Sequence, residues 1–541
     1  MLAYVRRRPE ESVLYGVVQA ELESFLADAQ ARERPVPRFV ERELRAFLAC
    51  GILAHGFVRV RCDTCARERL VAFACKGRGF CPSCGGRRMA DTAAHLVDRV
   101  IPWVPARQWV LSLPYALRYR LAWDARLASQ VLSCFLGSVF ASLRRRARLR
   151  IGRRRSFQCG AVTFVQRFGD ALNLNVHFHA LVLDGVYARG ESGGPRFHPL
   201  PPPDGDEVAR VARRIARRIV RLLERRGLHP AADSEEADPL GDRQPLLACL
   251  YAASVSGRVA TKSRAGRRTL RVGDRIDPEA LPELEGERCA SVDGVSLHAN
   301  VAVPARDRRR LERLCRYMAR PPVATDRLSR LADGRLLYRL KHRWRDGTSH
   351  IVFEPRELLE KLAALVPPPR FHMARYHGVL GPCASARPRV VPVAQEPAPP
   401  TVLEAATTHV GCHASDHGGG SPSRQPVHGD HAEFAARSAP SAGTELRTPD
   451  SASESAPIAS LVRARRLAWA DLMRRVFALD VLECPGCGGR MRILAAIHPP
   501  EAAQAILACL GLPERAPPIA PARAVEEDVE PGSGSLDDFD C

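Results

Sequence analysis

Aromatic residues and long apolar runs are scarce in this sequence. Aromatic residues make up 6% of the 541 residues, and tyrosine occurs only nine times. No apolar run reaches the roughly 18 residues that a membrane-spanning helix needs, and the N-terminal MLAYVRRRPEE has no apolar signal-peptide core. The sequence therefore predicts a cytoplasmic protein that makes no membrane contact.

Two common catalytic signatures are also missing. The chain has no Gly-x-x-x-x-Gly-Lys-Ser/Thr loop for nucleotide phosphates, and no signature of a serine or cysteine triad. These absences argue against a nucleotide-driven enzyme and against a triad hydrolase.

Positive charge and cysteine are abundant. Lys and Arg total 81 against 60 Asp and Glu, so the formal net charge is +21. Such an excess predicts a polyanionic partner, and nucleic acid is the first choice. The 17 cysteines are an odd number without a secretory signal, which favours metal-bound thiolates over disulfides.

Composition divides the chain into five parts. We expect an N-terminal helical and zinc-binding domain at 1–95 and a catalytic domain at 96–384. A Pro-, Ser- and Gly-rich stretch without periodicity predicts a disordered linker at 385–457. A small helical module with a Cys-x-x-Cys pair is expected at 458–515, and an acidic tail at 516–541.

Hydrophobic periodicity predicts an α+β fold. Segments 160–168 and 172–183 are rich in β-branched and aromatic residues and are separated by Gly-Asp, which is typical of two strands joined by a turn. Helices are expected at 207–226 and 306–320, and a hairpin at 335–354. Arginine and lysine alternate along that hairpin, which makes it a candidate DNA platform.

Two Cys-x-x-Cys pairs predict one structural zinc site. Cys62 and Cys65 are separated from Cys81 and Cys84 by fifteen residues, a spacing typical of four-thiolate zinc sites. Two residues between thiolates let both reach one tetrahedral ion. The alternative is a set of unliganded thiols, and we expect the nearby Cys50, Cys75 and His55 to be core or surface residues.

A third pair has no evident partner. Cys484-Pro-Gly-Cys487 lies in the C-terminal module, where His498 and Cys509 could complete a site but lack the usual spacing. Whether this pair binds zinc is left open.

A His-hydrophobic-His pattern lies in the second predicted strand. His177 and His179 are two residues apart, so both imidazoles point to one face of the sheet. Two neutral imidazoles can form half of a divalent-metal site, although a solvated or half-buried pair is the common alternative. A third ligand is not assigned, and Gln158 and Gln166 are polar residues in nearby strands.

Tyr317 is the candidate nucleophile. On a helix, its neighbours Leu311, Leu314 and Met318 share one apolar face, and Tyr317 lies off that face beside arginines. The alternative is a tyrosine that borders the core.

These motifs together resemble the rolling-circle insertion-sequence transposases of the IS91 type, whose nuclease is of the HUH (His-hydrophobic-His) class. The resemblance extends from about residue 10 to 380, and it rests on CDTCARERLVAFACKGRGFCPSC, NLNVHFHALVLDGVY, RYMARPP, RWRDGTSHIVFEP and RYHGVLGP. The segment FALDVLECPGCGGRMRI is similar to the C-terminal part of the same proteins.

The resemblance implies a five-stranded HUH nuclease fold behind an N-terminal zinc module. It implies that His177 and His179 bind Mg²⁺ or Mn²⁺, and that Tyr317 attacks single-stranded DNA to form a 5′-phosphotyrosine. DNA at the element ends and at the target site, single- or double-stranded, would be the partner. The expected DNA-binding residues are Arg310, Arg313, Arg335, Arg339, Lys341 and Arg343.

One position departs from the two-tyrosine members of that family. They carry a second tyrosine four residues before the last one, and Arg313 stands there in this chain. We therefore expect one nucleophile per chain.

Three other functions remain open. A tyrosine recombinase would use His342, Arg345 and Tyr376, whose spacing is suitable. A plasmid replication or mobilisation nickase would use the same histidine pair, and a non-catalytic zinc-dependent DNA-binding protein would use neither.

Overall fold

The computed structural model describes residues 6–152, 155–191, 193–228, 238–273, 287–392 and 469–523. Of the linker predicted at 385–457, residues 393–457 lie outside the described part, as do residues 524–541 of the predicted acidic tail. The prediction is wrong for 385–392, because Ala386 and Val390 are buried in a hydrophobic core. The described residues belong to one compact unit.

The fold is α+β with antiparallel sheets, as predicted, and a seven-stranded sheet forms its centre. The resemblance implied five strands. The two strands expected at 160–168 and 172–183 are its neighbours β4 and β5. The strand order is β15 (Ala374–Gly378), β4 (Gly160–Phe168), β5 (Leu174–Leu183), β3 (Ala106–Ser112), β10 (Val295–His298) and β9 (Cys289–Val292), with β11 (Ala302–Val303) also paired to β3.

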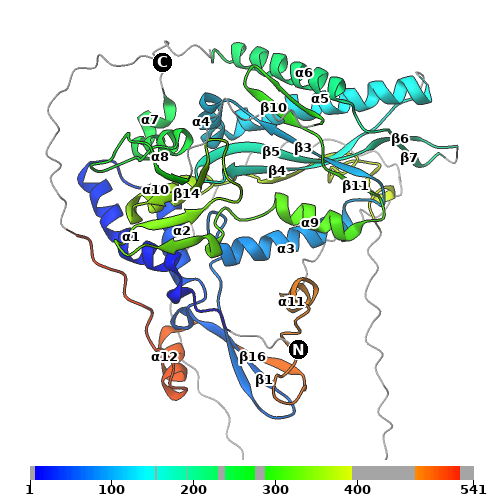
Figure 1. Cartoon of the computed structure of the whole chain (residues 1–541). Helices are drawn as coiled ribbons and strands as arrows, with labels where there is room; N and C mark the ends of the chain where they lie inside the picture. Colours follow the sequence, from blue (N-terminus) through cyan, green and yellow to red (C-terminus); the bar gives the residue numbers. More distant parts are fainter. Residues whose placement is uncertain are drawn as a thin grey trace, which may run out of the picture. The chain divides into compact units, whose positions relative to one another are not determined.

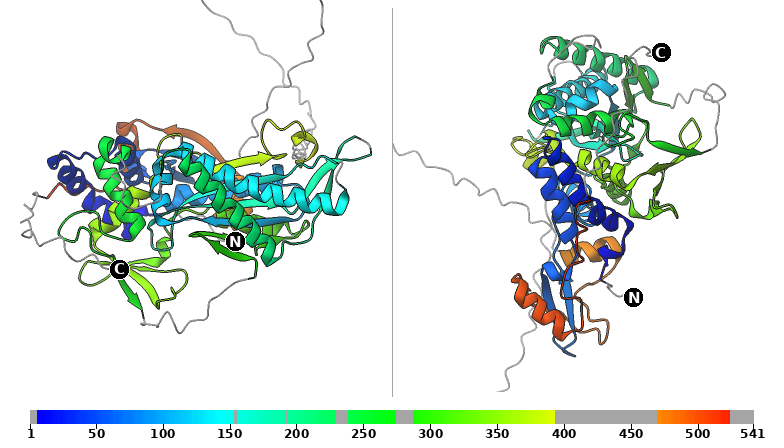
Figure 2. Two further views of the ribbon diagram at one scale, coloured as in Figure 1. Left: turned by 90° about the horizontal axis from the view of Figure 1, so that it is seen from above. Right: turned by 90° about the vertical axis from the view of Figure 1, so that its left-hand side faces the viewer.

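The two faces of this sheet pack against different helices. The face with Val176 and Phe178 contributes to the larger core, which includes α5 (Ala125–Ile151) and α6 (Gly205–Glu224). The face with Leu181 packs with α3 (Pro82–Arg99) and α9 (Arg308–Met318) in a second core. Figure 1 shows α5 and α6 on one side of β3–β5 and the other two helices on the opposite side. In Figure 2, α5 and α6 lie side by side.

Helix α5 is the one described helix that is long and apolar enough to cross a membrane by length and composition. Its N-terminus is capped, because the Asp124 side chain accepts a hydrogen bond from the Leu127 amide. Since 61% of its apolar window is buried, α5 serves here as a core helix.

The N-terminal region combines helices with a small sheet. Helices α1 (Val13–Ala31) and α2 (Arg38–Ala49) fall within the helical and zinc-binding domain expected at 1–95. They precede a hairpin of β1 (Phe57–Cys62) and β2 (Glu68–Ala72), and β1 also pairs with β16 (Met491–Ile497).

The C-terminal segment is not purely helical, in contrast to the expectation for 458–515. It consists of α11 (Trp469–Phe477), the strand β16 and α12 (Pro500–Cys509). The strand completes the small N-terminal sheet, and the two ends of the chain therefore share one sheet.

The hairpin predicted at 335–354 is confirmed, and its sheet lies beside the helices that complete the domain. The hairpin consists of β13 and β14, with the turn at Asp346-Gly347. Its sheet has the order β12 (Leu328–Arg330), β13 (Leu336–Arg339), β14 (Thr348–Phe353) and β8 (Leu270–Gly273). Strands β6 (Gly185–Arg189) and β7 (Pro195–Pro199) form a two-stranded ribbon. The helices are α4 (Tyr115–Trp123), α7 (Pro239–Arg243), α8 (Pro245–Ser256) and α10 (Pro355–Leu365).

Candidate active site

The two histidines lie on the face of β5 that packs against α9. Their ring centroids are 4.9 Å apart, and both side chains are buried. In the sheet register, His177 stands opposite Gln166 of β4, and His179 stands opposite Phe164 of β4 and Val110 of β3. The alternation of a β-strand thus places both imidazoles in one small space between the sheet and the helix.

The hydrogen bond of His177 selects one tautomer. Its Nδ1 lies 2.9 Å from the backbone oxygen of Asn175. Because a carbonyl oxygen can only accept, Nδ1 carries the proton and donates it. The lone pair is then on Nε2, which is the arrangement that metal-binding histidines commonly have.

Gln108 of β3 orients His179. The Gln108 side-chain nitrogen lies 2.8 Å from His179 Nδ1, and the Nε2 of His179 is buried without a partner. Amide oxygen and nitrogen are assigned from the hydrogen-bond network. With the nitrogen toward Nδ1, Gln108 donates and the His179 proton is on Nε2; exchanging the amide oxygen and nitrogen puts the proton on Nδ1 and leaves the Nε2 lone pair for a metal.

Burial keeps both imidazoles neutral. Burial, together with the positive charges of Arg320 and Arg118, lowers the pKa of His177 to about 4. Burial also holds the pKa of His179 well below its usual value, with added repulsion from His177 and Arg320. Neutral imidazole is the form that binds a metal ion.

Gln166 is the strongest candidate for a third metal ligand. Its side-chain nitrogen donates to the backbone oxygens of Met318 at 2.8 Å and Tyr317 at 3.3 Å. Its oxygen Oε1 is buried without a hydrogen-bond partner. A buried acceptor without a donor is costly, and Gln166 stands opposite His177 in the sheet register, so its oxygen could join the two imidazoles around a divalent cation. Gln158, the other sequence candidate, is exposed and bridges to Tyr187 only through its backbone.

Tyr317 faces this histidine pair. It is the last residue but one of α9, whose first turn is capped by the Asp307 side chain accepting from the Arg310 amide at 2.9 Å. The apolar residues of α9 face the second core, while the Tyr317 side chain is 38% exposed. Its ring centroid lies 6.0 Å from that of His179, with the rings at 87°. The tyrosine is therefore an accessible residue at the rim of the histidine site.

Two cations lie over the Tyr317 ring. The Arg320 guanidinium is 4.2 Å and the Lys341 ammonium 4.8 Å from the ring centroid. Arg320 also donates to the Tyr317 backbone oxygen at 3.0 Å. The expected neighbours Arg310 and Arg313 are exposed on the same helix, but the cations at the ring come from the segment after α9 and from the β13–β14 connection.

The residues of the predicted DNA platform are divided. Arg339, Lys341 and Arg343 line a cavity of about 380 Å³ together with Arg327. Arg335, in contrast, forms an ion pair of 2.6 Å with Asp333. The platform therefore reaches the tyrosine through Lys341.

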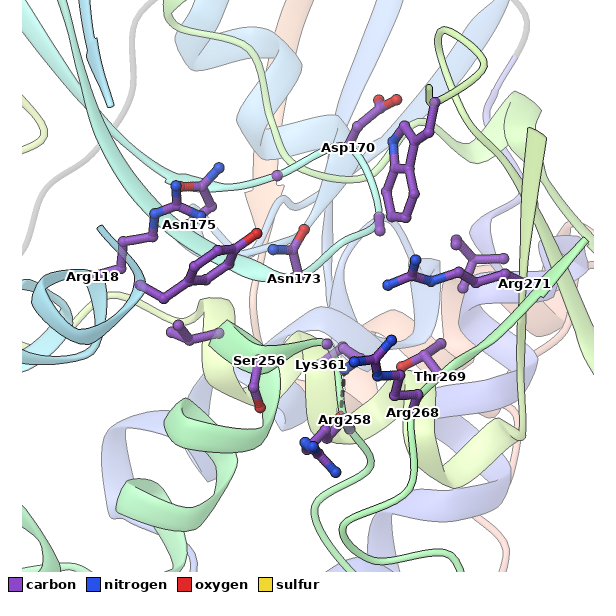
Figure 3. Close-up of a pocket in the computed structure, with 17 residues that line it drawn as sticks. Arg118, Asp170, Asn173, Asn175, Ser256, Arg258, Arg268, Thr269, Arg271 and Lys361 are labelled. Atoms are coloured by element: carbon purple, nitrogen blue, oxygen red, sulfur yellow. Dashed lines mark hydrogen bonds between the residues drawn. The ribbon is translucent and has the colours of Figure 1, made fainter. Parts of the chain in front are cut away.

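A larger groove begins beside the histidines, and sequence patterns did not reveal it. It has a volume of about 660 Å³, and Figure 3 shows its side chains converging from several elements. Asn175, whose backbone oxygen orients His177, is part of its wall. The basic residues of the wall are Arg118, Arg258, Arg268, Arg271 and Lys361, its aromatic residues are the exposed Tyr115 and the partly buried Trp344, and Asp170 is its one carboxylate.

The residues that a tyrosine recombinase would use belong to two different sheets. His342 and Arg345 lie in the connection between β13 and β14, and Tyr376 lies in β15 opposite Val162. Burial raises the pKa of Tyr376. This tyrosine borders the second core, so it is poorly placed as a nucleophile.

The structure corrects the predicted four-cysteine zinc site. Cys81 and Cys84 lie with Cys50 and Cys75, which we expected to be core or surface residues. Within this first cluster the sulfurs of Cys84 and Cys50 are 3.7 Å apart, and those of Cys84 and Cys75 are 3.4 Å apart. Four thiolates this close can share one tetrahedral ion.

Cys62 and Cys65 belong to a second cluster. They lie at the turn of the β1–β2 hairpin, whereas Cys50 and Cys75 flank its open end. Because a strand rises about 3.3 Å per residue, the six-residue β1 separates the two ends by roughly 20 Å. Their partners are the pair Cys484 and Cys487, which are close to them in the described part of the chain, whereas His498 stacks on Phe73.

Two protein-family models match the chain. The family described as "Putative transposase" matches residues 160–387, which hold the histidine pair and Tyr317. The family described as "Transposase zinc-binding domain", of the IS91 group, matches residues 19–113, which hold the complete first cysteine cluster. No curated protein and no solved structure matches. The two matches cover more than half of the sequence, in the order zinc module and then transposase domain.

Proposed function

We propose that this chain cuts and rejoins single-stranded DNA through a phosphotyrosine on Tyr317. Its zinc-binding and transposase domains make it a transposase of the IS91 type. The observation that carries the proposal is the 6.0 Å between the ring centroids of Tyr317 and His179. An accessible phenol and a buried pair of neutral imidazoles meet there, and the wall of the basic groove includes Asn175, two residues before His177.

The reaction exchanges one phosphodiester for another. The phenol oxygen of Tyr317 attacks phosphorus and loses its proton to solvent, and the bond to the 3′-oxygen of the preceding nucleotide breaks. The 3′-oxygen takes up a proton, and the 5′-phosphate remains on the tyrosine. Attack of a 3′-hydroxyl on this ester reverses the steps and rejoins a strand, so the bond energy is conserved and no nucleotide hydrolysis is needed.

The residues around the histidines suit a divalent metal. His177, His179 and the oxygen of Gln166 would hold it, and a carbonyl-type oxygen is a donor that Mg²⁺ and Mn²⁺ accept. When bound, such an ion supplies Lewis-acid polarisation of the phosphate.

Residues of the chain itself prepare the nucleophile. Gln166 and Arg320 bind the backbone oxygen of Tyr317 at 3.3 and 3.0 Å and so fix the end of α9. The charges of Arg320 and Lys341 over the ring stabilise the negative charge that develops on the phenol oxygen.

The groove and the basic surface would hold the DNA strand. Exposed aromatic rings next to arginines are typical of single-strand binding, because bases stack on the rings while cations contact phosphates. Tyr115 is 64% exposed with Arg118 4.3 Å from its ring centroid, and Arg271 lies 4.9 Å from that of Trp344. Arg310, Arg313, Arg335, Arg339, Lys341 and Arg343 would extend this surface toward cytoplasmic DNA at element ends and targets.

The test is covalent capture of DNA. Full-length protein is incubated with single-stranded oligonucleotides and Mn²⁺, and the adduct is mapped by mass spectrometry. We expect the 5′-phosphate on Tyr317, loss of adduct in Tyr317→Phe with DNA binding retained, and normal adduct in the control Tyr376→Phe. An adduct on Tyr376 or a 3′ linkage would favour a recombinase. Binding without any adduct would leave a non-catalytic DNA-binding protein.

A further inference from the structure

The second cysteine cluster joins residues from opposite ends of the chain. The sulfurs of Cys62 and Cys487 are 3.5 Å apart across 425 residues of sequence, and those of Cys65 and Cys484 are 3.6 Å apart across 419. All four lie within 4.8 Å of one another. Sulfurs bound to one tetrahedral Zn²⁺ at about 2.3 Å would be about 3.8 Å apart, so the observed spacing fits one ion.

The two Cys-x-x-Cys turns have the same backbone conformation. In each, the amide after the second cysteine donates to the carbonyl of the first: Ala66 to Cys62 at 3.1 Å and Gly488 to Cys484 at 2.9 Å. Both donors have positive φ, 58° for Ala66 and 71° for Gly488. Each turn therefore points its two sulfurs to one side, and the two turns face each other.

The contact between the turns requires a glycine. A Cβ at Gly489 would overlap the Thr64 hydroxyl and lie 3.0 Å from the Cys62 sulfur. Directly beside the cluster, Val60 and Met491 pack with Cys62 and Cys484 in a small core. The C-terminal turn is thus shaped to approach the N-terminal one.

We propose that Cys62, Cys65, Cys484 and Cys487 form a second structural zinc site, which fastens the C-terminal segment to the N-terminal hairpin. The matched zinc-binding domain ends at residue 113, so it contains only half of this site. The chain then carries two zinc ions, one within the N-terminal module and one between the ends.

The fastened segment makes further contacts that the zinc would support. Strand β16 pairs with β1 along its length, and α12 packs Leu507 against Leu53 and Phe57. On α11, Arg475 pairs with Asp98 of α3 and, at 2.8 Å, with Glu312 of α9. Figure 1 shows α11 beside α3 and β16 beside β1. The zinc site therefore secures a segment that reaches the helix carrying Tyr317.

Zinc content of the purified full-length protein tests the proposal. We expect two zinc ions per chain, one in Cys484→Ser/Cys487→Ser, and two in the control Cys509→Ser, which alters an exposed cysteine of α12. Two ions retained in the double variant, or one ion in the wild type, would overturn the proposal.

Two measurements cover the case in which the double variant misfolds. Hydrogen exchange of the variant should accelerate about tenfold or more in 57–62 and 491–497 while β4 and β5 stay protected; unchanged exchange in 491–497 contradicts the proposal. On the wild type, zinc X-ray absorption should give four sulfur ligands per ion at about 2.3 Å. An average close to three sulfurs would refute the site without any variant. None of these readouts depends on DNA cleavage.

Discussion

Replacing Gln166 tests how the site positions its nucleophile. Gln166 makes two hydrogen bonds to the last backbone oxygens of α9, at 2.8 and 3.3 Å, and holds an unpaired buried oxygen opposite His177. Gln166→Leu keeps a similar volume but removes all three polar functions. Each lost hydrogen bond is worth about 1 kcal/mol, and a nucleophile displaced by about 1 Å reacts on the order of 100-fold more slowly.

Gln166→Glu separates the two roles of this side chain. The carboxylate keeps an oxygen for the metal and adds negative charge, but it cannot donate to the carbonyls of α9. We therefore expect tighter Mn²⁺ binding together with slower cleavage, whereas Gln166→Leu weakens both.

The assay is single-turnover formation of the covalent adduct, with the Mn²⁺ dissociation constant measured by calorimetry on zinc-loaded protein. Gln158→Leu is the matched control, since this glutamine is exposed, and it should behave like the wild type. The reasoning fails if Gln166→Leu forms adduct at the wild-type rate. It also fails if Gln166→Glu loses as much Mn²⁺ affinity as Gln166→Leu.

Three further predictions concern charge, pH and stacking. Arg320→Ala should slow adduct formation about tenfold, and Arg320→Lys should restore part of the rate; an unchanged rate in Arg320→Ala contradicts the role of its charge. Because burial lowers the pKa of His177 to about 4 and that of His179 well below its usual value, the imidazoles stay unprotonated until the pH approaches 4. The Mn²⁺ dissociation constant should therefore differ less than twofold between pH 7.5 and 6.0, whereas an exposed histidine pair would lose Mn²⁺ affinity about 15-fold over that range. A loss of affinity above tenfold refutes the neutral buried pair. Tyr115→Ala should weaken single-stranded DNA binding about 5- to 150-fold without changing its salt dependence. The control is Trp103→Ala, which removes another exposed aromatic ring under an arginine and should bind DNA normally. Equal losses of affinity in the two variants would mean that bases do not stack on Tyr115.

The alternation of residues in a strand explains which part of the site could be predicted. His177 and His179 share a face because they are two residues apart, and Tyr317 lies off the apolar stripe of its helix. Both statements need only local periodicity. Gln108 is different, since it reaches His179 from β3, a strand 71 residues away in the sequence. Only the strand order of the sheet brings it there, and periodicity within one segment carries no information on that order.

The cysteine pairs show the same limit in a sharper form. Counting residues between Cys65 and Cys81 treats the intervening chain as a flexible loop that can close on itself. Residues 57–72 instead form a hairpin, and a hairpin holds its turn and its open end apart by the length of its strands. Had the alternation in FVRVRC and ERLVA been taken as two paired strands, the pairs at the two ends would have needed separate partners. Cys50 and Cys75 were then available at the open end, and at the turn only a distant pair such as Cys484 and Cys487 could complete the four ligands.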